Sequence, residues 1–238
     1  MSLYLNFGRL KIAKIKINYV LDIGANIGEF SDLLKKIFPE CAFQLIEPNK
    51  DLNNILEKKG YNFHNLLLYK EKDKKVKLYF EDSGNTTTGN SIYKENSRHY
   101  EQNKFKLFTT HILDELKTPD IIDLIKIDVQ GAEIDVFKGG IQTLKKTKFI
   151  LVETSLVQYN LDAPLEKNVI EFLSNNSFSS YIEFDRHIWN DSNLNNYNLK
   201  IGDVFQRDLL FINNKVRIKT KLKFKLLKLY IYFKNLIK

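Results

Sequence analysis

Short apolar runs alternate with amphipathic stretches along most of the chain. The apolar runs have the length and composition of strands, and we expect strands at Tyr19–Ile23, Ala42–Glu47, Asn62–Leu67, Lys75–Phe80, Ile122–Asp128, Phe149–Glu153, Ser179–Phe184 and Val204–Ile212. The spacing of apolar residues predicts helices at Glu29–Ile37, Asp51–Lys58, Leu113–Lys117, Glu133–Lys145 and Leu165–Asn175. Strands and helices in this alternation predict an α/β fold with a Rossmann-like, doubly wound and mostly parallel sheet.

Two polar stretches interrupt this alternation. Residues 81–103 are rich in Ser, Thr, Asn and Gly, and a connection of this length is usually functional or mobile. Residues 190–198 hold five asparagines around Leu194 and indicate an exposed loop. A bias in composition toward Lys, Asn and Ile is an equally simple explanation of the second stretch.

The length of 238 residues suits one large domain with appended ends. We expect a basic N-terminal segment at 1–17, a core domain at 18–214 and a basic amphipathic tail at 215–238. A single cysteine, Cys41, excludes an internal disulfide.

The net charge of +8 is concentrated in the tail. Residues 215–238 carry nine basic and no acidic side chains, which leaves 28 basic against 29 acidic side chains in the rest of the chain. Domains that bind long nucleic acids usually spread positive charge over their own face. The near-neutral body therefore argues against nucleic acid as a partner.

The tail predicts contact with an anionic surface. Basic and apolar or threonine residues alternate from Lys215 to Lys225, which is a strand period, and helical spacing follows to Lys238. A basic amphipathic segment suits an anionic membrane or a glycolipid, while a dimer contact, a nucleic-acid tether and a soluble tail remain alternatives. Without a signal sequence or a membrane-spanning run, we expect a cytoplasmic protein, with peripheral contact at the inner membrane face as one role of the tail.

The first predicted strand runs into a glycine-containing turn and a helix. Gly24 and Gly28, with Ala25 and Asn26 between them, leave room for a ligand beside the backbone, at the start of a helix with free N–H groups. Nicotinamide enzymes usually have G-x-G-x-x-G here, whereas this turn has G-x-x-x-G after Asp22. An acidic residue at this position suits the cationic amino-acid end of S-adenosylmethionine, and a loop cap is the alternative.

A second acidic residue ends the next predicted strand. Glu47, followed by Pro48, lies about twenty residues beyond the glycine turn, where a carboxylate accepts hydrogen bonds from the ribose hydroxyls of an adenosine. The alternative is a carboxylate that caps the helix at 51–58, although Asn49 and Asp51 suit that role better.

The chain resembles the FkbM-type family of class I S-adenosylmethionine-dependent methyltransferases. The resemblance lies in Leu21–Gly28, Glu47–Asn49, Asp123–Glu133, Phe137–Gly140 and Val152–Glu153. Gln130 stands where the family usually has a glutamate, and the segment Phe108–Leu116 has one residue more than the family pattern. The resemblance implies methyl transfer to a hydroxyl oxygen of a sugar, glycan precursor or other small acceptor, with S-adenosylhomocysteine as the second product.

Candidate catalytic residues lie at the end of the strand at 122–128. Ligands of open α/β sheets bind beyond the carboxyl ends of strands, where Lys126, Asp128 and Glu133 fall. Asp128 is the leading candidate for the base that takes the proton of the acceptor. Lys126 could adjust the basicity of Asp128, bind an acidic sugar, or form an ion pair with Glu153. Glu133 either acts in the site or only stabilises its helix by opposing the helix dipole.

Alternatives remain for the base, for a metal and for the function. His99, in the polar loop, and His111 are the other candidate proton acceptors, and an exposed histidine is the simpler interpretation of His99. Asp128 with Glu153 or His111 offers ligands for a divalent metal, but the spacing does not require one and we predict none. An RNA ribose methyltransferase and a non-catalytic S-adenosylmethionine-binding protein are the competing functions.

Overall fold

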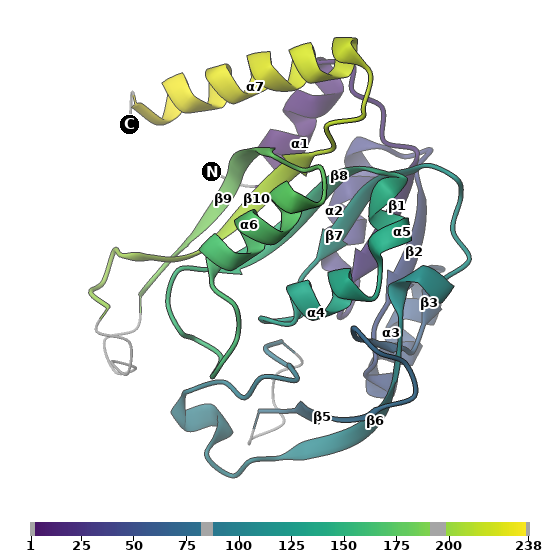
Figure 1. Ribbon diagram of the computed structural model, residues 1–238, viewed down its shortest axis with the longest axis vertical. Helices are drawn as coiled ribbons and strands as arrows, with labels where there is room; N and C mark the ends of the chain where they lie inside the picture. Colours follow the sequence, from purple (N-terminus) through teal and green to yellow (C-terminus); the bar gives the residue numbers. More distant parts are fainter. Residues whose placement is uncertain (1–2, 82–87, 191–198, 237–238) are drawn as a thin grey trace.

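The computed structural model describes residues 3–81, 88–190 and 199–236 (Figure 1). The polar stretch predicted at 81–103 is therefore described at residue 81 and from residue 88 onward. Residues 191–198 of the asparagine-rich stretch, with Leu194, lie outside the described residues, as do residues 237 and 238 of the tail.

A mostly parallel sheet forms the centre of the molecule. Its strands lie in the order β3-β2-β1-β7-β8-β10-β9, and their bounds are β1 Tyr19–Ile23, β2 Ala42–Ile46, β3 Asn62–His64, β7 Ile122–Ile127, β8 Thr147–Ser155, β9 Ser180–Ile188 and β10 Val204–Ile212. Strands β3, β2, β1, β7 and β8 run parallel to one another, and β10 is antiparallel to both β8 and β9. The strand order reverses between β1 and β7, so the carboxyl ends of these two strands flank the crevice where such sheets bind ligands.

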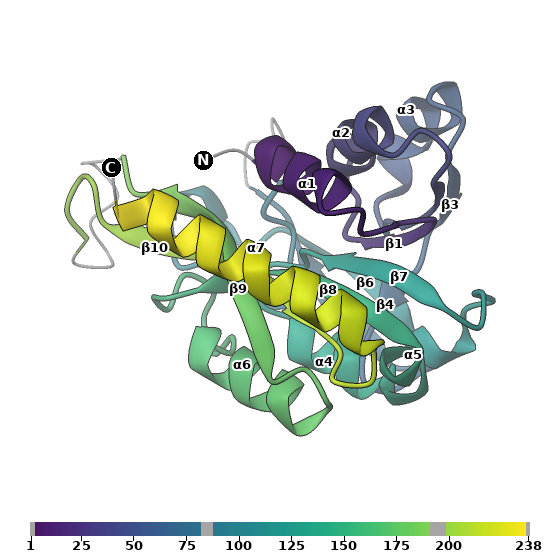
Figure 2. The ribbon, with the colours of Figure 1, turned by 90° about the horizontal axis from the view of Figure 1, so that it is seen from above.

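Helices cover both faces of this sheet (Figures 1 and 2). The helices are α1 Leu3–Ile12, α2 Glu29–Ile37, α3 Asn53–Lys58, α4 Glu133–Lys138, α5 Ile141–Lys145, α6 Glu166–Asn175 and α7 Ile218–Leu236. Val20, Leu124 and Leu151 pack in one buried cluster with α1, α2 and α7. Their strand neighbours Leu21 and Ile125 pack in another with α4, α5 and α6. The predicted doubly wound α/β fold is confirmed.

Helix α2 shows how the sequence specifies its elements. Leu34 and Ile37 face the core, acidic residues lie in its first turn and lysines in its last, as the helix dipole favours. Its bounds, and those of β1 and β10, agree with the prediction.

A second, smaller sheet lies beside the main one. It has the order β4-β6-β5, with β4 Leu67–Leu68, β5 Lys75–Tyr79 and β6 Phe105–His111. The single strand predicted at 62–67 is wrong, because its end belongs to β4 in this second sheet. Strand β6 was not predicted; Phe105 and Leu107 are exposed on it while Thr110 is buried, so it lacks the usual apolar buried face.

Three predicted helices are broken or shortened. The helix predicted at 133–145 divides into α4 and α5 at Gly139 and Gly140, where a Cβ on Gly139 would lie 2.3 Å from the carbonyl oxygen of Tyr69. The helix predicted at 51–58 begins as the 3-10 turn η1 Lys50–Leu52, and the one at 113–117 is only the 3-10 turn η3 Leu113–Glu115. A third 3-10 turn, η2 Arg98–Tyr100, lies within the polar stretch.

Both ends of the chain pack against the core. Phe7 and Leu10 of α1 and Phe224, Leu227 and Ile231 of α7 belong to the same buried cluster. The strand period predicted at 215–225 is wrong, since α7 is one helix that buries residues spaced three and four positions apart. No helix in the described part of the chain combines the length and the apolar character that a bilayer crossing requires.

Candidate active site

The turn after β1 is held tightly against two neighbouring strands. The backbone N–H groups of Gly24 and Ala25 donate to the carbonyl oxygen of Ile46 at 2.9 and 3.1 Å. Gly24 has φ +73°, and a Cβ there would lie 1.9 Å from the carbonyl oxygen of Asp128. Only glycine allows the loops after β1 and β7 to approach this closely.

Glu47, at the end of β2, joins the glycine turn to the loop that follows it. Its Oε2 accepts a hydrogen bond from the backbone N–H of Asn26 at 2.9 Å, and its Oε1 accepts one from Asn49 at 2.8 Å. The carboxyl group is buried, and this burial raises its pKa, against the lowering effect of the two N–H donors. Each carboxylate oxygen keeps a further lone pair for a ligand.

A first cavity opens between the glycine turn, the end of β2 and the second sheet. It encloses about 740 Å³, including the space at its mouth. Its wall combines polar groups from the loops after β1, β2 and β7 with apolar side chains from 66–68, 78 and 92. Of the predicted cofactor residues, Gly24, Asn26, Glu47 and Pro48 line this cavity.

The other three predicted cofactor residues lie behind the wall. Ala25 is buried, and Gly28, with φ +78°, begins α2. Asp22 is wholly buried and accepts a hydrogen bond from the Ser31 hydroxyl at 2.7 Å. Asp22 lines neither of the cavities described here.

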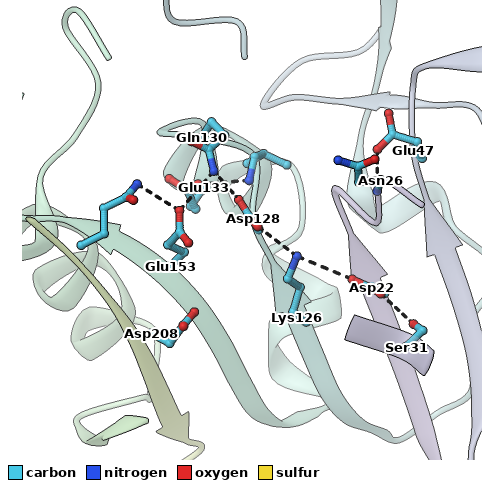
Figure 3. Close-up of polar contacts among 12 residues, drawn as sticks. Asp22, Asn26, Ser31, Glu47, Lys126, Asp128, Gln130, Glu133, Glu153 and Asp208 are labelled. Atoms are coloured by element: carbon cyan, nitrogen blue, oxygen red, sulfur yellow. Dashed lines mark hydrogen bonds and ion pairs between the residues drawn. The ribbon is translucent and has the colours of Figure 1, made fainter. Parts of the chain in front are cut away.

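A chain of charged and polar side chains crosses the carboxyl ends of β1, β7 and β8 (Figure 3). Lys126 Nζ lies 3.2 Å from Asp128 Oδ2 and 3.9 Å from Asp22 Oδ1. These two carboxylates raise the pKa of Lys126, although burial acts in the opposite direction. The ion pairs of Lys126 are thus with Asp22 and Asp128 rather than with Glu153, the partner considered from the sequence.

Gln130 continues this chain to Glu153. Its Nε2 donates to Asp128 Oδ1 at 2.7 Å and to Glu153 Oε1 at 3.1 Å, from a backbone with φ +54° (Figure 3). A neutral amide therefore bridges two carboxylates at the position where the resemblance led us to expect a third one.

Glu133 has a different role from its neighbours. Its side chain is buried, and its Oε1 accepts hydrogen bonds from the backbone N–H groups of Val129 and Gly131 at 3.2 and 3.0 Å. Burial raises the pKa of Glu133 to about 7. Glu133 lines neither cavity, so its contacts hold the loop that carries Asp128 and Gln130.

A second cavity adjoins the first. Thr88, Gly89, Asp128 and Gln130 belong to the walls of both cavities. The rest of the second wall consists of Glu81, Glu95, His99, Tyr100, Glu153, Tyr159, Phe205 and Gln206. Asp128 and His99, two of the three predicted proton acceptors, thus face one cavity, and His99 Nδ1 lies 3.8 Å from Glu81 Oε1.

Several residues of the second cavity were not predicted. Glu95 and Tyr159 lie in two irregular segments, which are joined by an isolated β-bridge between Glu95 and Asn160. No sequence motif indicates either residue. Gln206, whose Nε2 donates to Glu153 Oε1 at 3.0 Å, lies on β10 beside Phe205, far in sequence from Asp128 and Glu153. The available signal was the polar run Gln206–Asp208 within a strand whose other residues are apolar.

One group of metal-ligand side chains is present among the described residues. It consists of Glu153, His187 and Asp208, and His187 Nε2 lies 3.2 Å from Asp208 Oδ2 and 3.4 Å from Glu153 Oε2. The hydrogen bond to Asp208 and the charge of Glu153 raise the pKa of His187, and burial raises the pKa of Glu153. His111, considered above as a metal ligand, lies on β6 and lines neither cavity.

Comparisons with known proteins agree with this geometry. A family profile described as "Methyltransferase FkbM domain" matches residues 22–180, which is more than half of the chain. The 2-O-methyltransferase NoeI of Sinorhizobium fredii (strain NBRC 101917 / NGR234) is 43% identical over 79 residues. This match spans 33% of the present chain and 31% of NoeI.

Solved structures with low sequence identity are also similar. YcgJ of Bacillus subtilis has a TM-score of 0.49 at 12% identity, over 90% of this chain and 100% of its own. The N-methyltransferase NodS of Bradyrhizobium japonicum WM9, solved with S-adenosyl-L-homocysteine, has a TM-score of 0.49 at 12% identity, over 89% of this chain and 86% of its own.

Proposed function

Because the chain belongs to the FkbM family of S-adenosylmethionine-dependent methyltransferases, we propose that it methylates a hydroxyl oxygen on a sugar, a glycan precursor or another small hydroxylated acceptor. The matched relative NoeI is a 2-O-methyltransferase, which supports oxygen as the methylated atom, and the match covers about a third of its length. The geometry that carries the proposal is the position of Asp128 on the shared wall of two adjoining cavities.

The first cavity suits S-adenosylmethionine. The Glu47 carboxylate would accept hydrogen bonds from the ribose hydroxyls, and Gly24 and Asn26 of the glycine turn line the cavity with it. Leu67, Leu68 and Ile92 offer an apolar surface for the adenine ring. When bound, S-adenosylmethionine supplies an electrophilic methyl group on a positively charged sulfur.

The second cavity suits the acceptor. Tyr159 and Phe205, whose ring centroids are 6.0 Å apart, offer flat apolar faces of the kind that pack against a sugar ring. The carboxylates of Glu81, Glu95 and Glu153 offer acceptors for hydroxyl groups around that ring. The shared wall brings a hydroxyl bound here next to the first cavity, which is the positioning that methyl transfer requires.

Asp128 is the group best placed to take the proton from the acceptor hydroxyl. Gln130 holds one of its oxygens and Lys126 the other, so the carboxylate is fixed in orientation with lone pairs left over. A positioned base of this kind contributes about 10²–10⁴-fold to a rate. His99, on the wall of the second cavity, is the second candidate.

The charge of the second cavity supports an uncharged or cationic acceptor. Four acidic side chains line it, burial raises the pKa of two of them, Glu95 and Glu153, and none of its described lining side chains is a lysine or arginine. Phosphate groups need positive partners, so this wall disfavours sugar phosphates and RNA at the acceptor position. An acidic sugar held by Lys126 is disfavoured for the same reason, because Lys126 is occupied by Asp22 and Asp128.

A panel of acceptors tests the proposal. Formation of S-adenosylhomocysteine would be measured with neutral sugars and glycosides, amino sugars, sugar phosphates and a short RNA. We expect turnover with neutral or amino sugars, and we expect Asp128→Asn to lower kcat about 10²–10⁴-fold with little change in S-adenosylmethionine affinity.

Two controls accompany this assay. Asp120→Asn changes an exposed aspartate outside both cavities and should leave turnover unchanged. His99→Gln separates the second candidate base from the first. Turnover with RNA alone, or full activity of Asp128→Asn, would contradict the proposal, and cofactor binding without turnover of any acceptor would favour a binding protein.

A further inference from the structure

Helix α7 has a buried face and an exposed apolar face. Phe224, Leu227 and Ile231 are buried against the sheet. On the opposite side, apolar residues recur at intervals of four, four and three positions, which places them along one line of a helix. This outward stripe consists of Ile218, Leu222, Leu226 and Leu229, which are between 46% and 74% exposed.

Lysines border the outward stripe on both sides. At 100° per residue, Lys219 and Lys223 lie along one edge and Lys221 and Lys225 along the other, where Lys228 follows with its Nζ over the ring of Tyr181, 5.4 Å from the centroid. A helix with an apolar line between two rows of cations has the pattern of helices that lie in the plane of a membrane surface.

Helix α1 extends the same surface. Arg9 of α1 lies over the ring of Tyr230 at 5.2 Å from its centroid, and Lys223 Nζ donates to the carbonyl oxygen of Lys14 at 2.9 Å. Tyr4, Leu5 and Ile12 add exposed apolar side chains. Figure 2 shows α1 and α7 beside one another on one side of the molecule.

The charge of this surface is of one sign. Residues 3–17 and 215–236 contain no aspartate or glutamate, whereas residues 18–214 carry 24 basic and 29 acidic side chains. Two copies of the chain that met through this same surface would bring positive charge against positive charge, which disfavours self-association there. Nucleic acid would satisfy the lysines but would leave the apolar stripe exposed to water.

We propose that α7 and α1 dock this protein on an anionic lipid surface, with the outward stripe inserted among the acyl chains and the bordering lysines among the headgroups. Both parts of the surface then have partners: the leucines leave water, and the lysines contact negative charge. Figure 1 shows α7 at the end of the molecule away from β5 and β6, near which the cavities lie. The docked protein therefore keeps its cavities open to solution.

Co-sedimentation with vesicles tests this docking. We expect the full chain to bind vesicles of phosphatidylcholine with phosphatidylglycerol, to bind phosphatidylcholine alone much more weakly, and to be released by high salt. Each of Lys219→Gln and Lys225→Gln should lower the affinity about fivefold, and the double change Leu222→Ser with Leu226→Ser about tenfold or more.

Matched controls distinguish a loss of vesicle binding from a loss of folding. Leu107→Ser with Ile121→Ser changes two exposed apolar residues outside α1 and α7 and should leave vesicle binding unchanged. All variants should keep the wild-type melting temperature and S-adenosylmethionine affinity. Equal binding to neutral and anionic vesicles, no binding to either, or a dimer in solution that Leu222→Ser with Leu226→Ser dissociates would overturn the proposal.

Discussion

At the scale of single residues, two buried glutamates show how position decides the use of a carboxylate. Glu47 and Glu133 each accept hydrogen bonds from two backbone N–H groups in loops at the ends of strands. Glu47 reaches the wall of the first cavity, whereas Glu133 lies behind the walls of both. We therefore expect a change at Glu47 to alter ligand binding and a change at Glu133 to alter stability.

Replacement of Glu47 by glutamine should weaken cofactor binding. The change removes the negative charge and turns one acceptor into a donor facing a backbone N–H group, so the affinity for S-adenosylmethionine should fall about 10–100-fold. Isothermal calorimetry with S-adenosylmethionine and S-adenosylhomocysteine measures this loss. Glu57→Gln, on the exposed side of α3, is the matched control. Unchanged affinity in folded Glu47→Gln would remove Glu47 from the cofactor site.

Glu133 makes stability depend on pH. Its pKa is raised on folding from 4.5 to about 7. Between these two pH values the folded chain holds a proton on Glu133 that the unfolded chain has released. Stability should therefore fall as the pH rises through this window, by about 3 kcal/mol in all. Glu133→Gln keeps an oxygen for Val129 and Gly131 but does not titrate.

Urea unfolding at pH 5 and pH 8 measures this effect. The free energy of unfolding of Glu133→Gln should rise relative to wild type by about 2.5 kcal/mol between the two pH values, because part of the effect is already lost at pH 5. Glu57→Gln again controls for loss of a surface charge. Parallel pH curves for wild type and Glu133→Gln would show that Glu133 does not titrate in this range.

Residues next to strand ends could be predicted, and residues brought in by distant loops could not. Glu47 and Asp128 follow buried strands, and local sequence indicated both. The contacts of Gln130 and Gln206 with Glu153 join separate strands of the sheet, so they depend on register and strand order. Asp22 ends a strand as well, but its depth of burial depends on α2 and β7, which local sequence does not describe.

At the scale of elements, the glycine turn after β1 fixes the distance between two loops of the site. Gly24→Ala would place a Cβ 1.9 Å from the Asp128 carbonyl oxygen, at a φ of +73°. Gly60→Ala introduces the same backbone strain at φ +72°, with nothing within 4 Å of its Cβ. Comparison of the two variants separates the destabilisation caused by the clash from the destabilisation caused by the backbone conformation.

We expect Gly60→Ala to lower the free energy of unfolding by about 1 kcal/mol and to leave cofactor binding intact. Gly24→Ala should lower the free energy of unfolding by about 1–3 kcal/mol more than Gly60→Ala does, because the loops after β1 and β7 must move apart. The same movement should weaken S-adenosylmethionine binding. Denaturant unfolding and calorimetry measure both quantities. Equal effects of the two substitutions would show that the close approach at Gly24 does not matter.

The elements that the sequence did not predict have weak or misleading periodicity. Helix α1 contains Gly8 at its centre and Asn6 on its buried side, so its apolar stripe is incomplete. In α7, lysines alternate with apolar residues over 219–226, a strand period, because the helix carries apolar residues on both its buried and its outward face. Periodicity identifies one apolar face well and two opposed faces poorly.

At the scale of the whole molecule, the two ends of the chain complete one core. Phe7 of α1 packs edge-on against Phe184 of β9, with ring centroids 5.0 Å apart. The ring centroids of Phe224 of α7 and Phe149 of β8 are 6.1 Å apart. The apolar cluster on this side of the sheet therefore contains residues from 7 to 231.

This arrangement has a consequence for synthesis on the ribosome. Helix α1 is translated before β9 and α7, and its first partner to be made is Phe30 of α2, whose ring centroid lies 5.7 Å from that of Phe7. The rest of the cluster around Phe7 and Leu10 is complete only once β9 and α7 have been translated, because it needs Phe184 and Phe224. Contacts between residues so far apart in sequence form late and slow the folding of the domain.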